Sequence, residues 1–124
     1  MSEVDAQALY IHRKHVGLRH IYNDAPQAVE AAQRYWERQL AVIAAELDAR
    51  PADDFLLGPD LQACDVLLGH CLIWAASLEW LPVPSMPDAT QTVVEYGRRL
   101  IHRPAFQKCV EMGCWSSTHL EKFL

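Results

Sequence analysis

An apolar stripe between Pro26 and Ala49 constrains most strongly what this chain can fold into. Apolar side chains recur there every three or four positions, which is the spacing of one face of an α-helix. Pro26 suits the first turn of a helix, and Pro51 disfavours helical backbone at the residue before it. The spacing therefore predicts one long amphipathic helix, which needs another element to cover its apolar face. The stripe consists of Val29, Ala32, Trp36, Leu40, Ile43 and Leu47.

A second long helix is predicted directly before this one, from about Val4 to Tyr22. Its apolar positions fall within a narrow arc at about 100° per residue, so they face a single partner. Only the short break Asn23–Pro26 separates the two helices, and long helices joined by a short turn pack antiparallel. The expected core face of the first helix consists of Val4, Ala8, Ile11, His15 and Leu18.

Three more helical segments follow, with no strand pattern between them. The segment from about Gln62 to Leu81 is apolar nearly all round, which is typical of a helix in the middle of a bundle. A proline-rich connector, residues 82–87, separates it from a helix at about Asp88–His102 and a short one at about Pro104–Met112. The tail behind them has room for one more turn. We expect one all-α domain over residues 1–124, a bundle of about five helices: two long antiparallel ones, a buried central one and two shorter ones.

The formal net charge of −5 argues against two classes of partner. Nucleic acid and anionic membrane surfaces both attract basic faces, so we expect neither. The first five residues are acidic and polar, unlike those of a signal peptide. The longest apolar stretch, Val66–Leu81, is too short and too interrupted to span a bilayer. We therefore expect a soluble, cytoplasmic protein.

The four cysteines, Cys64, Cys71, Cys109 and Cys114, include no C-x-x-C pair. A chain of this size without secretory features does not need disulfides to hold its core. We expect reduced thiols that pack mostly as small hydrophobic side chains. His70 precedes Cys71, but adjacent helical residues point about 100° apart. A structural role is therefore favoured over a catalytic Cys–His pair.

Three histidines of the first predicted helix raise the question of a metal site. His12, His15 and His20 are spread over a wide arc of the helix, which does not suit one ion. We expect no metal, and we interpret His15, on the core face, as a hydrogen-bonded interior histidine.

Three stretches of the sequence together resemble one family. Phe55–Gly58, followed by Gln62–Leu68, is similar to the loop and capping segment that opens the central helix of the C-terminal domain of glutathione transferases. Arg98–Lys108, with its Arg-Pro-Ala-Phe step, resembles the joint between the last two helices of that domain, and Ala28–Asp48 resembles its long second helix in bacterial members. From about Ala6 to Met112, the chain thus resembles the C-terminal all-helical domain of the cytosolic glutathione transferase family, bacterial type.

The capping segment of the third predicted helix has a clear physical role. Asp65, at the third helical position, can accept a hydrogen bond from the backbone N–H of Gln62, and Leu61 and Val66 can close a hydrophobic staple across the turn. The family pattern has serine or threonine where this chain has Gln62, and the loss of a good cap costs about 1 kcal/mol. We therefore expect half of the capping box, the bond from the Gln62 amide to Asp65, to be kept. We also expect the whole staple between Leu61 and Val66 to be kept.

The resemblance implies a function for the intact family protein. There, glutathione binds mainly to a thioredoxin-like domain, which this sequence lacks, and its thiolate attacks an electrophile in a hydrophobic pocket that the helical domain lines. We therefore expect a substrate-binding domain with no catalytic residue and no cofactor of its own. Glutathione would be the co-substrate of the intact enzyme, a thioredoxin-like domain the partner, and a homodimer the assembly. The alternatives are a stand-alone, non-catalytic protein-interaction module of the same fold, or a small-molecule carrier.

In this family the first helix of the domain faces the active site. The resemblance makes Tyr10, Arg13, Lys14 and Gly17, beside the core face, the candidates to meet substrate or glutathione, with the two cations attracting an anionic tripeptide. The alternative is a solvated charged flank beside a half-buried tyrosine. Trp115 follows the last helix and is expected either to close over the pocket or to anchor the tail.

A free helical domain would leave uncovered the face that the thioredoxin-like half buries in the family. That face is expected to be unusually apolar or mated with another chain. The flank of the first helix with Leu9, Val16 and His20 is the candidate for it.

Overall fold

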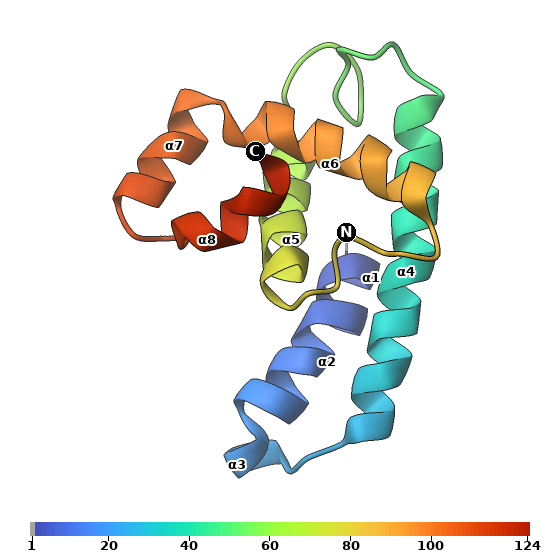
Figure 1. The fold of residues 1–124 in the computed structure, drawn as a ribbon, viewed down its shortest axis with the longest axis vertical. Coiled ribbons are helices and arrows are strands. Elements are labelled where there is room, and N and C mark those ends of the chain that lie inside the picture. Colours follow the sequence, from blue (N-terminus) through green and yellow to red (C-terminus); the bar gives the residue numbers. More distant parts are fainter. Residues whose placement is uncertain (1) are drawn as a thin grey trace.

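The computed structural model describes residues 2–124 and is all-helical over that range. The only strand-like feature there is an isolated antiparallel bridge between Phe55 and Gly58. The N-terminal helical segment and the next long helix form a hairpin, and the shorter helices gather around the open end of that hairpin (Figure 1). The expected all-α class is confirmed.

The long helix predicted from the apolar stripe is present, and five elements follow it. Prolines occupy the first turns of three of these helices, where their missing N–H groups would have no helical partner. Within residues 2–124, no helix is long and apolar enough to cross a bilayer. The elements are α4 (Pro26–Asp48), α5 (Ala63–Ser77), α6 (Pro87–Ile101), α7 (Pro104–Glu111), α8 (Ser117–Leu120) and the 3₁₀ turn η3 (Glu121–Phe123).

The first helix alternates between α and π turns, so the prediction of a regular helix was wrong. A π turn contains more residues than an α turn, and the buried face drifts from the expected 3.6-residue spacing. Leu9, expected on an exposed flank, is fully buried for this reason, together with Val4 and Ala8. The segments are α1 (Ser2–Val4), π-helical η1 (Asp5–Leu9), α2 (Tyr10–His12), π-helical η2 (Arg13–Gly17) and α3 (Arg19–Tyr22).

Trp36 of α4 lies in the middle of the core. Its side chain is fully buried, and its indole Nε1 donates a hydrogen bond to the carbonyl oxygen of Trp80 at 3.1 Å. α4 packs against both the N-terminal helix and α6, while α5 packs against α6 and buries Leu72 and Leu100. The predicted antiparallel pairing of the two long helices is confirmed (Figure 1).

The central helix α5 was predicted to be buried all round, but one side of it is open. Leu68, Leu72 and Cys71 are fully buried, whereas Val66 and Leu67 are 47% and 39% exposed. The chain therefore carries an apolar surface on α5 that nothing within residues 2–124 covers.

The end of α5 also differs from the prediction, which placed it near Leu81. The helix ends at Ser77 because Glu79 adopts a left-handed φ of 61° and the Trp80 amide donates to the Ala75 carbonyl oxygen at 2.9 Å. These are the marks of a Schellman turn, which glycine usually makes. Because glutamate stands where glycine is usual, the sequence does not indicate that α5 ends there.

The C-terminal tail holds more structure than the single turn expected, because α8 and η3 fold back on α6. Phe123 is fully buried, and a Cβ at Gly97 would lie 2.7 Å from its ring. Arg98 Nε donates a hydrogen bond to the Phe123 carbonyl oxygen at 3.0 Å. Glycine at position 97 therefore makes room for the ring that fixes the tail.

Candidate functional site

A hollow of about 590 Å³ lies between the first helix, α5 and the segment that follows α7. We call it the aromatic hollow, after the rings of Tyr10, His70, Trp74 and Trp115 in its lining. Its lining contains no aspartate or glutamate. The remaining lining residues are His12, Arg13, Val16, Gly17, Ser77 and Leu78.

The rings of the aromatic hollow meet edge to face. Ring centroids are 5.3 Å apart for Tyr10 and Trp74, 5.9 Å for His70 and Trp74, and 4.9 Å for His70 and Trp115. The Arg13 guanidinium lies 5.9 Å from the Tyr10 centroid, within cation–π range. The hollow therefore offers aromatic surface and one cation, which suits a planar aromatic ligand whose polar substituents carry negative charge.

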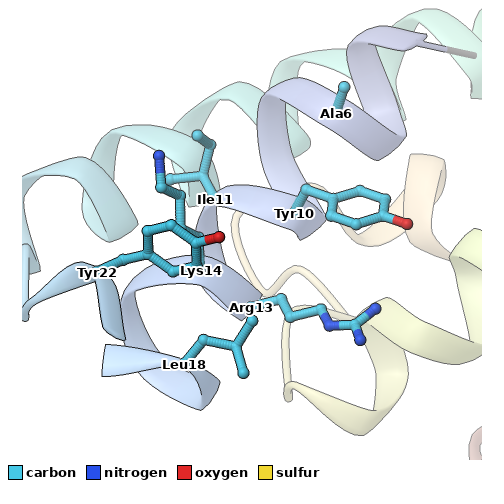
Figure 2. A pocket seen from close by; sticks show the side chains of 7 residues that line it. All are labelled: Ala6, Tyr10, Ile11, Arg13, Lys14, Leu18 and Tyr22. Atoms are coloured by element: carbon cyan, nitrogen blue, oxygen red, sulfur yellow. The ribbon is translucent and has the colours of Figure 1, made fainter. Parts of the chain in front are cut away.

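A second hollow, of about 530 Å³, lies next to the first and shares Tyr10 and Arg13 with it. Figure 2 shows these two side chains extending to the same side, away from Lys14 and Tyr22. The Lys14 ammonium lies 5.0 Å from the centre of the Tyr22 ring. Tyr10 and Arg13 thus lie on the boundary between the two hollows.

The structure brings most of the predicted site residues together. Tyr10, Arg13, Gly17 and Trp115 all line the aromatic hollow, whereas Lys14 lies in the second hollow. Tyr10 is exposed, and Trp115 is half-buried against His70. A Cβ at Gly17 would meet no other atom within 4 Å, so packing does not require glycine there.

Sequence reasoning missed His70 and Trp74 as lining residues. His70 was interpreted as a structural residue of a buried helix, but its side chain is exposed and packs between Trp74 and Trp115. The four-residue spacing of His70 and Trp74, which places them on one face of α5, is the signal that could have found them.

Asp65 at the start of α5 holds three distant segments together. Its Oδ2 accepts from the Gln62 amide at 2.7 Å, which is the half of the capping box that was predicted, and its Oδ1 accepts from the Leu56 amide at 2.9 Å and the Tyr96 hydroxyl at 2.5 Å. The other half, from the Asp65 amide to the Gln62 side chain, is present as well, so the prediction of half a box was wrong. The side chain is fully buried. Of the predicted staple, Leu61 is half-buried and Val66 stays largely exposed, so the staple covers little surface.

These hydrogen bonds keep Asp65 ionised. Burial raises the pKa of Asp65, but the hydrogen bonds from Tyr96, Leu56 and Gln62 outweigh it and hold the pKa below its ordinary value. Burial and the bond to Asp65 raise the pKa of Tyr96 well above its usual range, so its hydroxyl remains a donor. The pair is a structural network, away from the lining of the aromatic hollow.

His12, which lines the aromatic hollow, also makes the free energy of unfolding depend on pH. Its ring packs edge-on against Trp80 at 5.3 Å, and burial lowers the pKa of His12 below 6.5. The folded chain therefore favours neutral His12, and its contribution to stability is present above about pH 6.5 and is lost as the pH falls through the lower folded pKa. We expect His12→Gln to remove this part of the pH dependence, measured as urea unfolding free energies between neutral pH and pH 5. His102→Gln, at an exposed position, should leave it intact, and identical pH profiles for both variants would contradict the assignment.

The other histidines and the cysteines show no catalytic pairing. The Nδ1 of His15 donates to the Asn23 carbonyl oxygen at 3.0 Å, as interpreted, but the side chain is only half-buried and not in the interior. Burial and the Asp5 carboxylate raise the pKa of the Cys71 thiol to about 12, which keeps it unreactive. Within residues 2–124, no group of histidine, cysteine and acidic side chains has the arrangement of a metal site.

Two cysteines contradict the expectation that the thiols pack as small hydrophobes. All four are free, but Cys109 and Cys114 are exposed, and only Cys71 is fully buried. Both exposed thiols lie at the end of α7, where the chain turns toward Trp115.

No family model, no curated protein and no solved structure matches the chain.

Proposed function

We propose that the chain is the substrate-binding helical domain of a glutathione transferase-like protein, and that the aromatic hollow holds a planar, electron-poor electrophile. The observation that carries this proposal is the convergence of Tyr10, His70, Trp74 and Trp115 with Arg13 around one space of about 590 Å³. Ligand pockets in proteins have volumes of about 300–1,000 Å³ and apolar walls with few polar groups.

The chemistry of the lining favours an aromatic electrophile with polar substituents. Trp74 and Trp115 offer faces and edges against which an aromatic ring packs. Arg13 would draw nitro or carboxylate oxygens to one end, and no carboxylate in the lining opposes it. No group of the hollow is an activated nucleophile, so the attacking thiolate would come from glutathione bound elsewhere.

Two further contacts support the family resemblance on which this proposal rests. The Arg103 guanidinium, from the Arg-Pro-Ala-Phe step, lies 5.7 Å from the centre of the Phe55 ring, in the loop before α5. The Arg99 guanidinium, from the same stretch, also lies 5.7 Å from the centre of that ring. Stretches that resemble the family separately are therefore in contact with one another.

A partner would cover apolar side chains that are exposed on the first helix and on α5. Val16, Val66 and Leu67 are all exposed on the first helix and α5. In our proposal a thioredoxin-like domain, carrying glutathione, packs on this side, and the intact protein dimerises. The alternative is an interaction module in which the same apolar side chains dock another protein and the hollow has no ligand.

Binding of an unreactive nitroarene separates these two functions. We expect meta-dinitrobenzene to bind saturably to the chain, measured by calorimetry, without any glutathione conjugation by this chain alone. Trp115→Ala and Trp74→Ala should each weaken binding about fivefold, since aromatic packing beyond simple burial is worth about 1 kcal/mol.

The matched control is Tyr35→Ala, because Tyr35 lies on α4, outside the lining of the aromatic hollow. Its dissociation constant should equal that of the unmodified chain. Equal constants for all three variants, or no saturable binding, would favour the interaction module.

A further inference from the structure

The C-terminal end of α7 is a complete Schellman turn. The helix ends at Glu111, Met112 is its C-cap, and Gly113 has a left-handed φ of 76°. The Gly113 amide donates to the Val110 carbonyl oxygen at 2.9 Å. The Cys114 amide donates to the Cys109 carbonyl oxygen at 2.9 Å. These are the two hydrogen bonds that define the motif.

This turn brings two cysteines together that are five residues apart. Standard backbone dimensions and the hydrogen bond between their main chains keep the Cα atoms of Cys109 and Cys114 within about 6.8 Å. Disulfides span Cα separations of about 4.4–6.8 Å. In a Schellman turn the side chains at these two positions commonly touch, and they are usually apolar. Here both are thiols.

Cys109 and Cys114 are also the two cysteines that solvent reaches best. Both are free and exposed, whereas Cys64 is half-buried and Cys71 is fully buried with a pKa raised to about 12. Exposed thiols are the ones that small oxidants and other thiols can reach. Accessibility and proximity therefore coincide at one place in the chain.

We propose that Cys109 and Cys114 form a reversible dithiol–disulfide site that closes across the end of α7. With a disulfide of a small thiol, such as glutathione disulfide, as oxidant, one thiolate attacks it and releases one glutathione. The second thiolate then attacks the cysteine sulfur of the mixed disulfide, which forms the Cys109–Cys114 bond and releases the other glutathione as its thiolate. The protein loses two protons and two electrons, and the oxidant is reduced to two thiols.

The position of this site connects it to the aromatic hollow. Trp115 follows Cys114 directly, and its ring packs against His70 at 4.9 Å. Closing the disulfide fixes the turn that leads into Trp115. The redox inference itself rests on the turn geometry alone and does not depend on the proposed ligand.

The test measures how readily this pair closes in glutathione buffers of varied redox ratio. Trypsin cleaves after Lys108 and Lys122, so residues 109–122 form one peptide that contains both thiols. After alkylation, the oxidised form of this peptide carries no label and is lighter by two hydrogen atoms than the unlabelled dithiol. The redox ratio at which half of the peptide is oxidised gives the effective concentration of the two thiols. The same titration in concentrated guanidinium chloride gives the effective concentration for a chain without the turn.

We expect the effective concentration of the two thiols to be at least about tenfold higher in the folded chain than in the denatured one. Cys64→Ser should leave this value unchanged, and Cys114→Ser should abolish closure. Equal values in both states would overturn the proposal. So would a peptide that remains fully alkylated, that stops at a mixed disulfide with glutathione, or whose partner is Cys64.

Discussion

Replacing Asp65 by asparagine is expected to lower the free energy of unfolding by about 3 kcal/mol, because hydrogen bonds to a charged group contribute about 1.5–3 kcal/mol and a buried donor left without a partner costs about 1–3 kcal/mol. The asparagine amide oxygen can replace Oδ1, which accepts from Leu56 and Tyr96. Its NH₂ group would then face the Gln62 amide, which is also a donor. In the opposite orientation the oxygen would accept from the Gln62 amide, and the NH₂ group would face the Leu56 amide instead. One backbone donor would therefore lose its acceptor whichever way the side chain turned.

Urea unfolding with circular dichroism measures this loss. The matched control is Asp48→Asn, an exposed carboxylate that accepts one bond from the Thr92 hydroxyl at 3.0 Å, with an expected change within about 0.5 kcal/mol. Tyr96→Phe, which removes only the hydroxyl donor to Asp65, should fall between the two. If Asp65→Asn and Asp48→Asn unfold alike, the network does not hold the start of α5.

The lowered pKa of Asp65 also predicts how the free energy of unfolding decreases at acid pH. The pKa of Asp65 is lower in the folded chain than in the unfolded one, so its contribution is complete above about pH 4 and is lost as the pH falls through the folded value. Asp65→Asn should lack this part of the acid-induced loss. Asp48→Asn should retain it.

Replacing Phe123 by alanine is expected to cost about 3–5 kcal/mol, although the residue is second from the end of the chain. Its ring is fully buried against Gly97, and its loss would leave a cavity between α6 and the tail. Few terminal residues are tied down in this way. A large loss of stability would therefore indicate that the tail is part of the core, and a small loss would indicate that it is frayed.

Leu124→Ala is the control, since Leu124 is 72% exposed and next to Phe123. Thermal and urea unfolding should show little change for Leu124→Ala and a large loss for Phe123→Ala. Equal stabilities would mean that η3 does not contribute to the core.

Local patterns were sufficient to predict the long helices and the cap. The stripe of α4 keeps one period from Val29 to Leu47, and Asp65 and Gln62 are three residues apart, so both features depend on near neighbours. Leu56 and Tyr96 donate to the same carboxylate from separate segments, and no local pattern connects them. The hydrogen bond that caps α5 was therefore predictable, but the bonds by which Asp65 joins α5 to the segments of Leu56 and Tyr96 were not.

The departures from prediction have local causes that a single sequence hides. The π turns of the first helix change its period without a glycine or proline to mark them, and this moved Leu9 into the core. Glu79 takes the left-handed position that glycine usually marks, so the end of α5 was misplaced. The aromatic hollow depends on three segments meeting, and of its lining only Tyr10, Arg13, Gly17 and Trp115 were predicted as site residues.

The four tryptophans permit one direct test of the central claim, that the aromatic hollow binds a planar electrophile. Trp74 and Trp115 line the hollow, whereas Trp36 and Trp80 are buried in the core and joined by a hydrogen bond. The measurement is a proton–nitrogen NMR titration of the indole N–H signals with meta-dinitrobenzene. We expect the Trp74 and Trp115 signals to shift saturably with one dissociation constant while the other two stay in place. Signals that do not move, or four signals that move alike without saturation, would contradict the claim.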